Sequence, residues 1–320
     1  MQKAHRKGIS AALSSAAFLG MTPVFGKLAI NFGFSPLAVA ALRTAMAAGL
    51  ILIVMLLFFR PYLYIYPVGL IGCFLAGAIN GLGSILYYMA LERLDASVGQ
   101  ILYLSYPFFV AIWLILDHQP PSRLTIFRMG VAGLSLLLIT ALPEHHTDPI
   151  GIAMMLGAAA LYALHLPINQ RVLYEVPAPT VTLYTLIAMT IVVLPAYGFF
   201  DHQWIAPGLL WWPVIGLTFA TLLSRLALFL GVKHIGGMQT ALLGLSELLV
   251  TIIFSYIFLK ENLSWIQWLG AAGLGLSLLL VQFEESRPTP YKGKGGWLSW
   301  IRPPDLSHDI PADIPWGPHE

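Results

Sequence analysis

Long apolar stretches follow one another along most of this sequence. A helix of roughly 18 apolar residues or more is long enough to cross a hydrocarbon core of about 30 Å. We count ten such stretches: Gly8 to Ile30, Pro36 to Phe59, Pro67 to Leu91, Val98 to Leu116, Leu124 to Leu142, Ile150 to Gln170, Thr180 to Phe199, Gly208 to Leu230, Met238 to Leu259 and Trp265 to Phe283. The links between them are too short to hold a folded domain. The sequence therefore predicts an all-α integral membrane protein with ten transmembrane helices, and any activity must lie among those helices.

The composition agrees with a bilayer as the solvent. Hydrophobic residues make up 58% of the 320 residues and charged residues only 10%, whereas about a quarter of an ordinary soluble domain is charged. The net charge of +2 provides no basic excess for a phosphate backbone, so we expect no nucleic acid partner. The single cysteine, Cys73, excludes an internal disulfide. The expected partners are the lipid bilayer and a small-molecule solute, and the oligomeric state is left open.

The basic residues predict the orientation. Lys3, Arg6 and Lys7 precede the first apolar stretch, as they would in a signal peptide, but the stretch runs on to Ile30 without a persuasive cleavage site. We therefore expect it to be retained. Basic residues are more frequent in the links on the N-terminal side of the membrane, which places that side in the cytoplasm. With ten crossings, both termini are expected to be cytoplasmic, in a protein of the plasma (inner) membrane.

An internal repeat divides the chain into two halves. Residues Leu94, Leu102, Ser105 and Ile112 match Ile235, Leu243, Ser246 and Ile253, and Gly130, Ala132, Gly133 and Leu134 match Gly270, Ala272, Gly273 and Leu274. The predicted organisation is a cytoplasmic N-terminus (1–7), a first five-helix repeat (8–142), a linker (143–149), a second repeat (150–283) and a flexible cytoplasmic tail (284–320). Five crossings per repeat invert the second repeat relative to the first, as in secondary transporters. Chance similarity between apolar segments is the alternative.

These residues also suggest a family. The chain resembles the drug/metabolite transporter superfamily, and within it the EamA-like exporters with two five-helix repeats. The resemblance rests on Pro23, Gly26 and Lys27, on the segments 36–43 and 88–96, and above all on 246–275. In that last segment Ser246-Glu247-Leu248 stands for a usual Leu-Glu-Pro, and Lys260-Glu261-Asn262-Leu263-Ser264 for Gly-Glu-x-x-Ser. Leu248 departs from the family's proline, and 117–121 lacks the first-half version of the Glu motif. The resemblance implies export of a metabolite, amino-acid-like or drug-like solute.

Charged residues inside the apolar stretches are the first candidates for a site, because each costs at least ~2.5 kcal/mol at the bilayer centre. Glu247 lies about nine residues into its stretch, or ~14 Å deep. It either exchanges a proton or holds a cationic group, or it is the structural partner of Arg225. Arg43 either binds a carboxylate or phosphate through its planar fork, or caps helix carbonyls and extends toward the headgroups.

The repeat adds an argument for function. The positions that match Arg43, Arg225 and Glu247 in the other half are about Leu186, Ser84 and Tyr106. The charges are therefore not symmetric, which suits a ligand better than a packing scaffold. We predict Glu247, Arg225 and Arg43 as residues for substrate binding or coupling.

Aromatic and imidazole side chains complete the candidate site. Tyr88 and Tyr106 are predicted site residues, from a set of tyrosines able to line an amphipathic cavity (Tyr87, Tyr88, Tyr103, Tyr106, Tyr162 and Tyr184). Interfacial belts are the alternative location for some of these. His165 is either a proton relay or a hydrogen-bonded packing residue. Lys27 and Arg171, at matching ends of their stretches, are expected to be interface anchors.

Other classes of function find little support. His145 and His146 are adjacent in a polar link and are not spaced as metal ligands on a helix. The sequence contains no Walker-type glycine loop and no acyl-transfer constellation. We therefore expect no enzyme, no metal and no cofactor. The alternatives to an exporter are a sugar or nucleotide-sugar carrier of the same superfamily, and a channel or non-transporting membrane scaffold. Trp297, Trp300 and Ile301 in the tail are interpreted either as membrane- or partner-binding residues or as part of an unstructured tail with no specific role.

Overall fold

The computed structural model describes residues 2–94, 96–118, 120–139, 148–201, 210–250, 265–283, 297, 298 and 301. Every regular element in these ranges is helical. The elements are α1 (Gln2–Asn31), α2 (Pro36–Phe58), η1 (Arg60–Leu63), α3 (Pro67–Arg93), α4 (Ala96–Tyr103), α5 (Tyr106–Leu116), α6 (Arg123–Ile139), α7 (Pro149–Leu173), α8 (Ala178–Phe200), α9 (Trp212–Gly244), α11 (Trp265–Leu279) and η2 (Leu280–Phe283).

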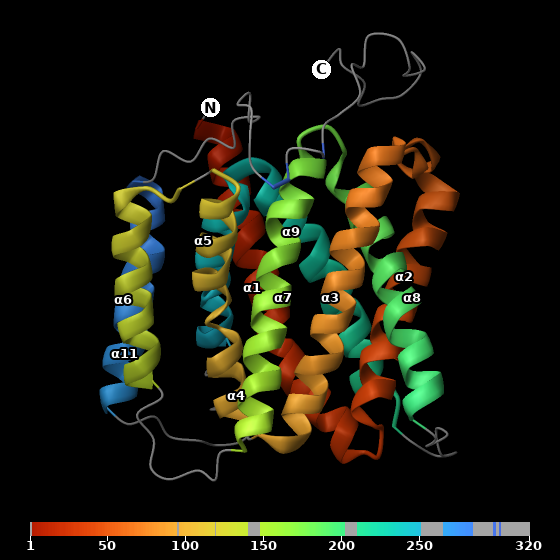
Figure 1. Ribbon diagram of the computed structural model, residues 1–320, viewed down its shortest axis with the longest axis horizontal. Coiled ribbons are helices and arrows are strands. Elements are labelled where there is room, and N and C mark those ends of the chain that lie inside the picture. The colour runs from red at the N-terminus through yellow and green to blue at the C-terminus, as the bar shows by residue number, and fades with distance from the viewer. Residues whose placement is uncertain are drawn as a thin grey trace.

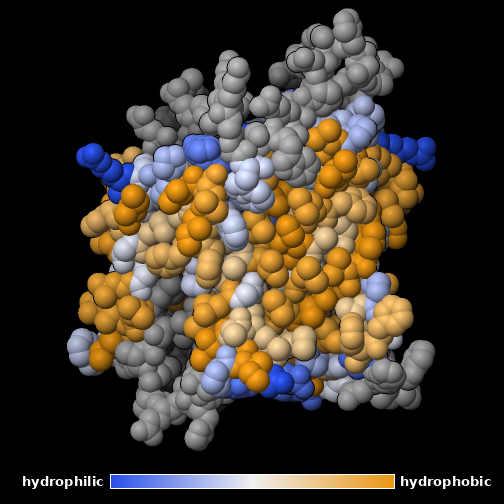
Figure 2. Space-filling model, viewed as in Figure 1, coloured by the Kyte–Doolittle hydropathy of each residue, from blue (hydrophilic) through white to orange (hydrophobic). Residues whose placement is uncertain are grey.

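Within the described ranges, six helices are long and apolar enough to cross a membrane, namely α1 from His5 onward, α2, α3, α7, α8 and α9. Figure 2 shows a broad apolar belt around the middle of the molecule, with hydrophilic residues toward both ends. Large apolar side chains such as Leu57, Phe58 and Leu137 are more than half exposed. An apolar surface of this extent needs lipid tails as its solvent. The expectation of an all-helical integral membrane protein is thus confirmed.

The helices stand side by side in one bundle (Figure 1). Helix α1 packs along α9, α3 packs against α7 and α8, and α6 pairs with α11 at one edge. Glycines permit the closest approach: a Cβ atom built on Gly77 would lie 2.5 Å from the carbonyl oxygen of Thr185, and one on Gly81 would lie 3.0 Å from Cβ of Val192. Small residues at these two positions therefore let α3 and α8 touch backbone to backbone, as in other membrane bundles.

The start of two helices shows how the local sequence sets their bounds. Ser35 Oγ accepts a hydrogen bond of 3.1 Å from Ala38 N at the start of α2, and Asp148 Oδ1 accepts one of 3.0 Å from Ile150 N at the start of α7. Each cap is followed by a proline at the first helical position, where the missing N–H leaves no hydrogen bond unmade.

The structure differs from the prediction at one span, where a helix is interrupted, and at one link, where a helix continues. The stretch predicted from Val98 to Leu116 consists of two helices, α4 and α5, interrupted at Leu104 and Ser105. The link predicted between Leu230 and Met238 is instead helical up to Ile235, and Gly236 alone is non-helical.

The turn at Gly236 has a clear physical cause. Its φ of 81° and ψ of 162° lie where a side chain would be strained, so glycine is the residue that fits. After the turn, Gly237 N donates a hydrogen bond of 2.7 Å to Gln170 Oε1, so α7 caps the short helical segment 237–244. This segment ends at a turn at Leu245, and residues 246–250 are helical again. The motif at Lys260 to Ser264 lies outside the described residues.

Candidate functional site

The residues that follow the turns at Leu104–Ser105 and at Leu245 contact the other half of the chain. Ser105 Oγ donates to Leu102 O at 2.6 Å and Ser246 Oγ donates to Leu243 O at 2.8 Å, so matched serines satisfy carbonyls at matched breaks. The following residues, Tyr106 and Glu247, are 2% and 4% exposed. The sequence alignment of the two halves had paired these positions, and the structure gives both the same place after a break.

Glu247 is held by an amide. Gln100 Nε2 donates a hydrogen bond of 2.5 Å to Glu247 Oε1, and Gln100 Oε1 accepts one of 3.0 Å from the Tyr87 hydroxyl. Helix α1 passes closely behind, since a Cβ atom on Gly20 would lie 2.7 Å from the carbonyl oxygen of Glu247. The carboxylate is therefore one end of a buried chain of polar groups that runs through Gln100 to Tyr87.

Arg225 is also buried, at 7% exposure, but has different partners. Arg225 Nη2 and Nη1 donate hydrogen bonds of 2.7 and 3.0 Å to the carboxamide oxygen of Asn80. Nη1 also lies 3.1 Å from His165 Nε2, and the guanidinium carbon lies 5.5 Å from the centre of the Tyr162 ring. His165 Nδ1 is hydrogen-bonded to the Tyr162 carbonyl, so donation from Nδ1 leaves Nε2 free to accept from Arg225.

Arg43 lies beside Arg225. Its Nη2 donates to Ser84 Oγ at 2.9 Å, its Nη1 donates to Thr221 Oγ1 at 3.3 Å, and its guanidinium carbon lies 5.0 Å from the centre of the Tyr88 ring. Ser84 is one turn from Asn80 on α3, and Thr221 is one turn from Arg225 on α9. The two guanidinium groups are therefore bound to neighbouring turns of α3.

Neutral groups surround both guanidinium groups. Among the described residues, neither Arg43 nor Arg225 forms an ion pair with a carboxylate, and Nε of Arg43 is buried without a hydrogen-bond partner. Buried guanidinium groups are usually paired with an anion, because their transfer out of water is costly. This pair of arginines therefore has the chemistry to bind an anionic group from a ligand.

A cluster of tyrosine rings fills the space between these charges. Ring centres are 4.8 Å apart for Tyr87 and Tyr103, 5.4 Å for Tyr103 and Tyr162, and 4.9 Å for Tyr106 and Tyr162. Tyr88 packs edge-on against Tyr87 at 5.3 Å. The Tyr103–Tyr162 contact is tilted and the other three are edge-to-face, so the rings form one continuous aromatic group with polar hydroxyls. We call these five residues the tyrosine cluster.

All six predicted site residues are brought together at this cluster: Glu247, Arg225, Arg43, Tyr106, Tyr88 and His165. Their roles in binding or coupling stay predictions. The structural pairing of Glu247 with Arg225, one of the two interpretations of Glu247, is not what the structure contains. Glu247 bonds to Gln100, and Arg225 bonds to Asn80 and His165.

Two other expectations need correction. Tyr184 lies away from the cluster and donates to Leu63 O at 2.6 Å. Arg171 is not an interface anchor: it is 7% exposed and donates hydrogen bonds of 3.2 and 2.7 Å to Asp117 Oδ2. Arg171 was expected at the surface because it ends an apolar stretch, but α7 is surrounded there by α3 and α5. The side chain of Lys27, and His145 and His146, lie outside the described residues.

The sequence interpretation missed three residues. Gln100 and Asn80 position Glu247 and Arg225, and both are isolated amides within apolar stretches, a signal that attention to charge alone overlooks. Arg128 on α6 was also missed, although it is 0% exposed. Its Nε donates to Ser277 O of α11 at 3.0 Å and its Nη1 donates to Gln239 Oε1. Arg128 thus joins the peripheral helix pair to the segment 237–244.

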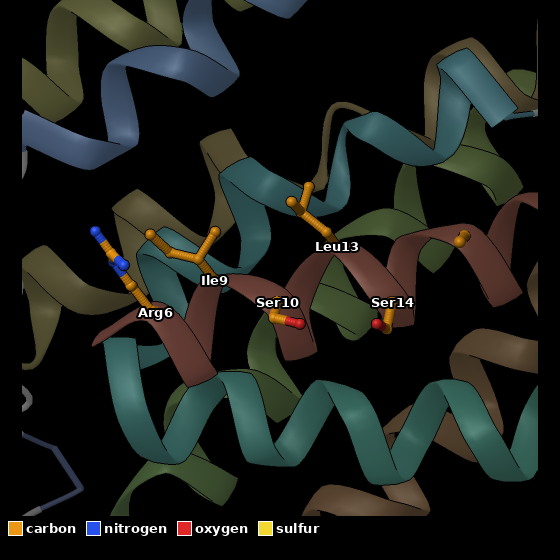
Figure 3. Close-up of a pocket in the computed structure, with 6 residues that line it drawn as sticks. Arg6, Ile9, Ser10, Leu13 and Ser14 are labelled. Carbon is orange, nitrogen blue, oxygen red and sulfur yellow. The ribbon is translucent and has the colours of Figure 1, made fainter. Parts of the chain in front are cut away.

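A hollow of about 490 Å³ lies elsewhere, along one face of α1, where it is lined by Arg6, Ile9, Ser10, Leu13, Ser14 and Ala17 (Figure 3). None of the tyrosine cluster lines it. The hollow opens at the side of the helix, so the convergence of charges at the cluster is the stronger candidate for a solute site.

The chain is similar in sequence to known membrane transporters. The model of the EamA-like transporter family matches two consecutive segments, residues 6–141 and 149–283. The threonine/homoserine exporter RhtA of Escherichia coli K12 is 27% identical over 277 residues, which cover 81% of this chain and 89% of that protein. A transporter of Synechocystis sp., described as uncharacterized, is 24% identical over 239 residues, or 69% of this chain and 68% of that protein.

One solved crystal structure has the same fold, with a TM-score of 0.70 at 13% identity over 88% of this chain and 97% of that chain. The family matches span nearly all of the helical part of the sequence. The resemblance inferred from the sequence is confirmed: this chain is an integral membrane protein and belongs to the EamA-like transporter family.

Proposed function

We propose that the chain is a secondary transporter that exports a small organic solute, amino-acid-like or drug-like, by alternating access. The observation that carries the proposal is the convergence of Arg43, Arg225 and Glu247 on the tyrosine cluster. These charges come from α2, α9 and the helical residues after Leu245, so elements from both halves supply them. A scaffold has no need to bring three charged side chains together inside a membrane.

The proposed architecture is ten transmembrane helices in two inverted five-helix repeats, residues 8–142 and 150–283. The matched helix breaks support it, as do the matched prolines inside α1 and α7, Pro23 and Pro167. In such proteins the two halves exchange conformations and the central site opens to each side in turn. The short segments next to Leu104 and Gly236 supply the discontinuous helices on which this exchange depends.

The proposed location is the plasma (inner) membrane, with both termini in the cytoplasm. Lys7 lies near the start of α1, Arg60 begins η1 after α2, and Arg123 begins α6. The start of α1, the end of α2 and the start of α6 lie at the same end of the bundle (Figure 1). Positively charged residues accumulate on the cytoplasmic side. The bacterial relatives agree with such a location.

The site suggests a solute with a carboxylate group. Two adjacent guanidinium groups can bind a carboxylate through several parallel hydrogen bonds. A cationic group on the same solute would lie toward Glu247 and the faces of the tyrosine rings. RhtA, the relative named above, exports threonine and homoserine, and both are amino acids. In the same proposal Glu247 exchanges a proton during the cycle and so couples transport to the pH gradient.

The test combines binding and transport. The purified protein is screened for thermal stabilisation by amino acids, other metabolites, sugars, nucleotide sugars and cationic drugs, because a ligand that binds the folded state raises its melting temperature. The hits are then assayed for counterflow in proteoliposomes. A solute with a carboxylate that stabilises the parent but not Arg43→Ala supports the proposal. Arg123→Ala, which removes an exposed arginine, is the matched control and keeps the shift.

The other outcomes identify the alternatives. Hits restricted to sugars or nucleotide sugars would favour that carrier class. Flux that never saturates with solute concentration would indicate a channel. Full function in a folded variant that lacks all three charges would reject the proposed site.

A further inference from the structure

Three described residues of the C-terminal tail contact the end of the bundle, and two of them are buried there. Leu298 is 0% exposed and Ile301 is 3% exposed, and both belong to the same apolar core as Val172 and Leu173 of α7. Ile301 also approaches α3, since a Cβ atom built on Gly72 would lie 3.8 Å from its Cγ2 atom. Apolar side chains buried to this extent are part of the folded core.

Polar contacts fix the same residues. Leu298 N donates a hydrogen bond of 3.2 Å to Asp117 Oδ1, while the other oxygen of Asp117 accepts from Arg171. Trp297 Nε1 donates to Trp113 O at 3.4 Å, and the two indole rings are 6.1 Å apart. Asp117 and Arg171 have side-chain exposures of only 1% and 7%. A backbone N–H that helps to satisfy a buried carboxylate is worth more than the same contact in water.

The contacts of these tail residues join the two halves of the transporter. Gly72, Trp113 and Asp117 belong to α3 and to the end of α5 in the first half, whereas Arg171 and Val172 belong to α7 in the second half. The start of α3 and the ends of α5 and α7 lie at the end of the bundle where α1 begins (Figure 1). We propose that Trp297, Leu298 and Ile301 form an intramolecular latch that holds this end of the transporter closed.

The energetic logic follows from the contacts. To open this end, α5 and α7 must separate at the Asp117–Arg171 ion pair, and the latch residues must leave the core. Release therefore exposes two apolar side chains to water and removes a hydrogen bond from a buried carboxylate. The latch acts on the opening step that the proposed function requires, but its docking can be measured without any solute.

Cys73 provides the measurement. It is the single cysteine of the chain, is 0% exposed and directly follows Gly72. Its rate of modification by a water-soluble maleimide reports how often this end opens. We expect the variant Leu298→Asp/Ile301→Asp to be modified at least tenfold faster than the parent, a change of about 1.4 kcal/mol in the closing equilibrium. Leu306→Asp, a leucine substitution elsewhere in the tail, is the matched control and keeps the parent rate.

A second variant makes the test independent of misfolding in the first. A chain truncated after Gly296 is expected to show the same fast modification, and a peptide of residues 296–302 added in solution should restore slow modification. Both variants are first checked for a monodisperse elution profile and parental helix content. An unchanged rate in both folded variants, or an equal increase in Leu306→Asp, would overturn the proposal. So would a rate that falls as protein concentration rises, since docking would then be between two chains.

The result is separable from the proposed function. Faster modification of Cys73 without counterflow of any solute would support the latch and count against transport. Counterflow with an unchanged modification rate would support transport and reject the latch.

Discussion

The side chain of Gln100 donates a hydrogen bond of 2.5 Å to the carboxylate of Glu247, across the boundary between the two halves of the chain. The opposite contact also exists: the Tyr106 hydroxyl donates to the carbonyl oxygen of Ala241 at 3.0 Å. The same sequence offset relates Gln100 to Ala241 and Tyr106 to Glu247. In each contact, a residue that follows the helix break of one half bonds to a residue that precedes the break of the other half. Only the contact of Glu247 contains a charged group.

Glu247→Gln tests the coupling role. The substitution keeps the size and the contact to Gln100 but cannot gain or lose a proton. We expect the variant to exchange solute across the membrane while losing the dependence of transport on an imposed pH gradient. Uptake into proteoliposomes with and without the gradient provides the measurement. If the variant responds to the gradient as the parent does, coupling by Glu247 is excluded.

Arg43→Lys tests the recognition of an anionic group. Lysine keeps the charge but not the planar fork, so the hydrogen bonds to Ser84 and Thr221 cannot both be kept together with those to a carboxylate. We expect KM for the exported solute to rise about tenfold or more, equivalent to roughly 1.4 kcal/mol. Initial rates over a range of solute concentrations measure it. An unchanged KM would show that Arg43 has a structural role only.

Gly77→Ala tests the contact between α3 and α8. The added Cβ would lie 2.5 Å from the carbonyl oxygen of Thr185, so the helices must move apart. Overpacking of this kind costs about 1–3 kcal/mol, and we expect a lower melting temperature. The control is Gly198→Ala on α8, where a Cβ has no neighbour within 4 Å, and which should not lower it. Equal effects of the two substitutions would contradict the close contact.

Arg93→Ala tests the hydrogen bond between Arg93 and Asp148, at the end of the bundle opposite to the latch. Asp148 lies outside the membrane-spanning segments, and hydrogen bonds from Arg93 and then from Ile150 N lower the pKa of its carboxyl group. Because the folded-state pKa is depressed, the stabilisation is present above the unfolded-state pKa and is lost as pH falls through the folded-state pKa. Arg93→Ala should therefore lower the melting temperature slightly at pH 6, and this difference should shrink toward pH 3. A difference that grows on acidification would contradict this assignment.

Much of the fold follows from the sequence because apolar length alone identifies helices in a membrane. The bounds of α2, α3, α7 and α8 agree with the predicted stretches to within a few residues. The breaks at Ser105 and Gly236 were harder to predict. A serine that bonds to a carbonyl of its own helix looks no different in sequence from one that faces a neighbouring helix. A glycine with positive φ looks no different from one that permits close packing.

The candidate site was predictable as far as charge and aromatic rings reveal it. Arg43, Arg225 and Glu247 stand out because ionised groups are rare inside apolar stretches. Their hydrogen-bond partners did not stand out, because an ion pair between Glu247 and Arg225 would satisfy these buried groups as well as the contacts that the structure contains. Only the three-dimensional arrangement distinguishes an arginine held by Asn80 and His165 from one held by a carboxylate.

Arg128 carries a consequence that reaches beyond the centre of the protein. It bonds to Ser277 on α11 and to Gln239 on the segment between Gly236 and Gly244, so any displacement of that segment pulls on the lipid-facing pair α6 and α11. The lipid around α6 and α11 then opposes the displacement of this segment during the transport cycle. A change in membrane thickness that moves α6 would therefore also act on this segment, both through Arg128 and through the hydrogen bond of 3.0 Å that Gln239 Nε2 donates to Thr125 Oγ1 on α6.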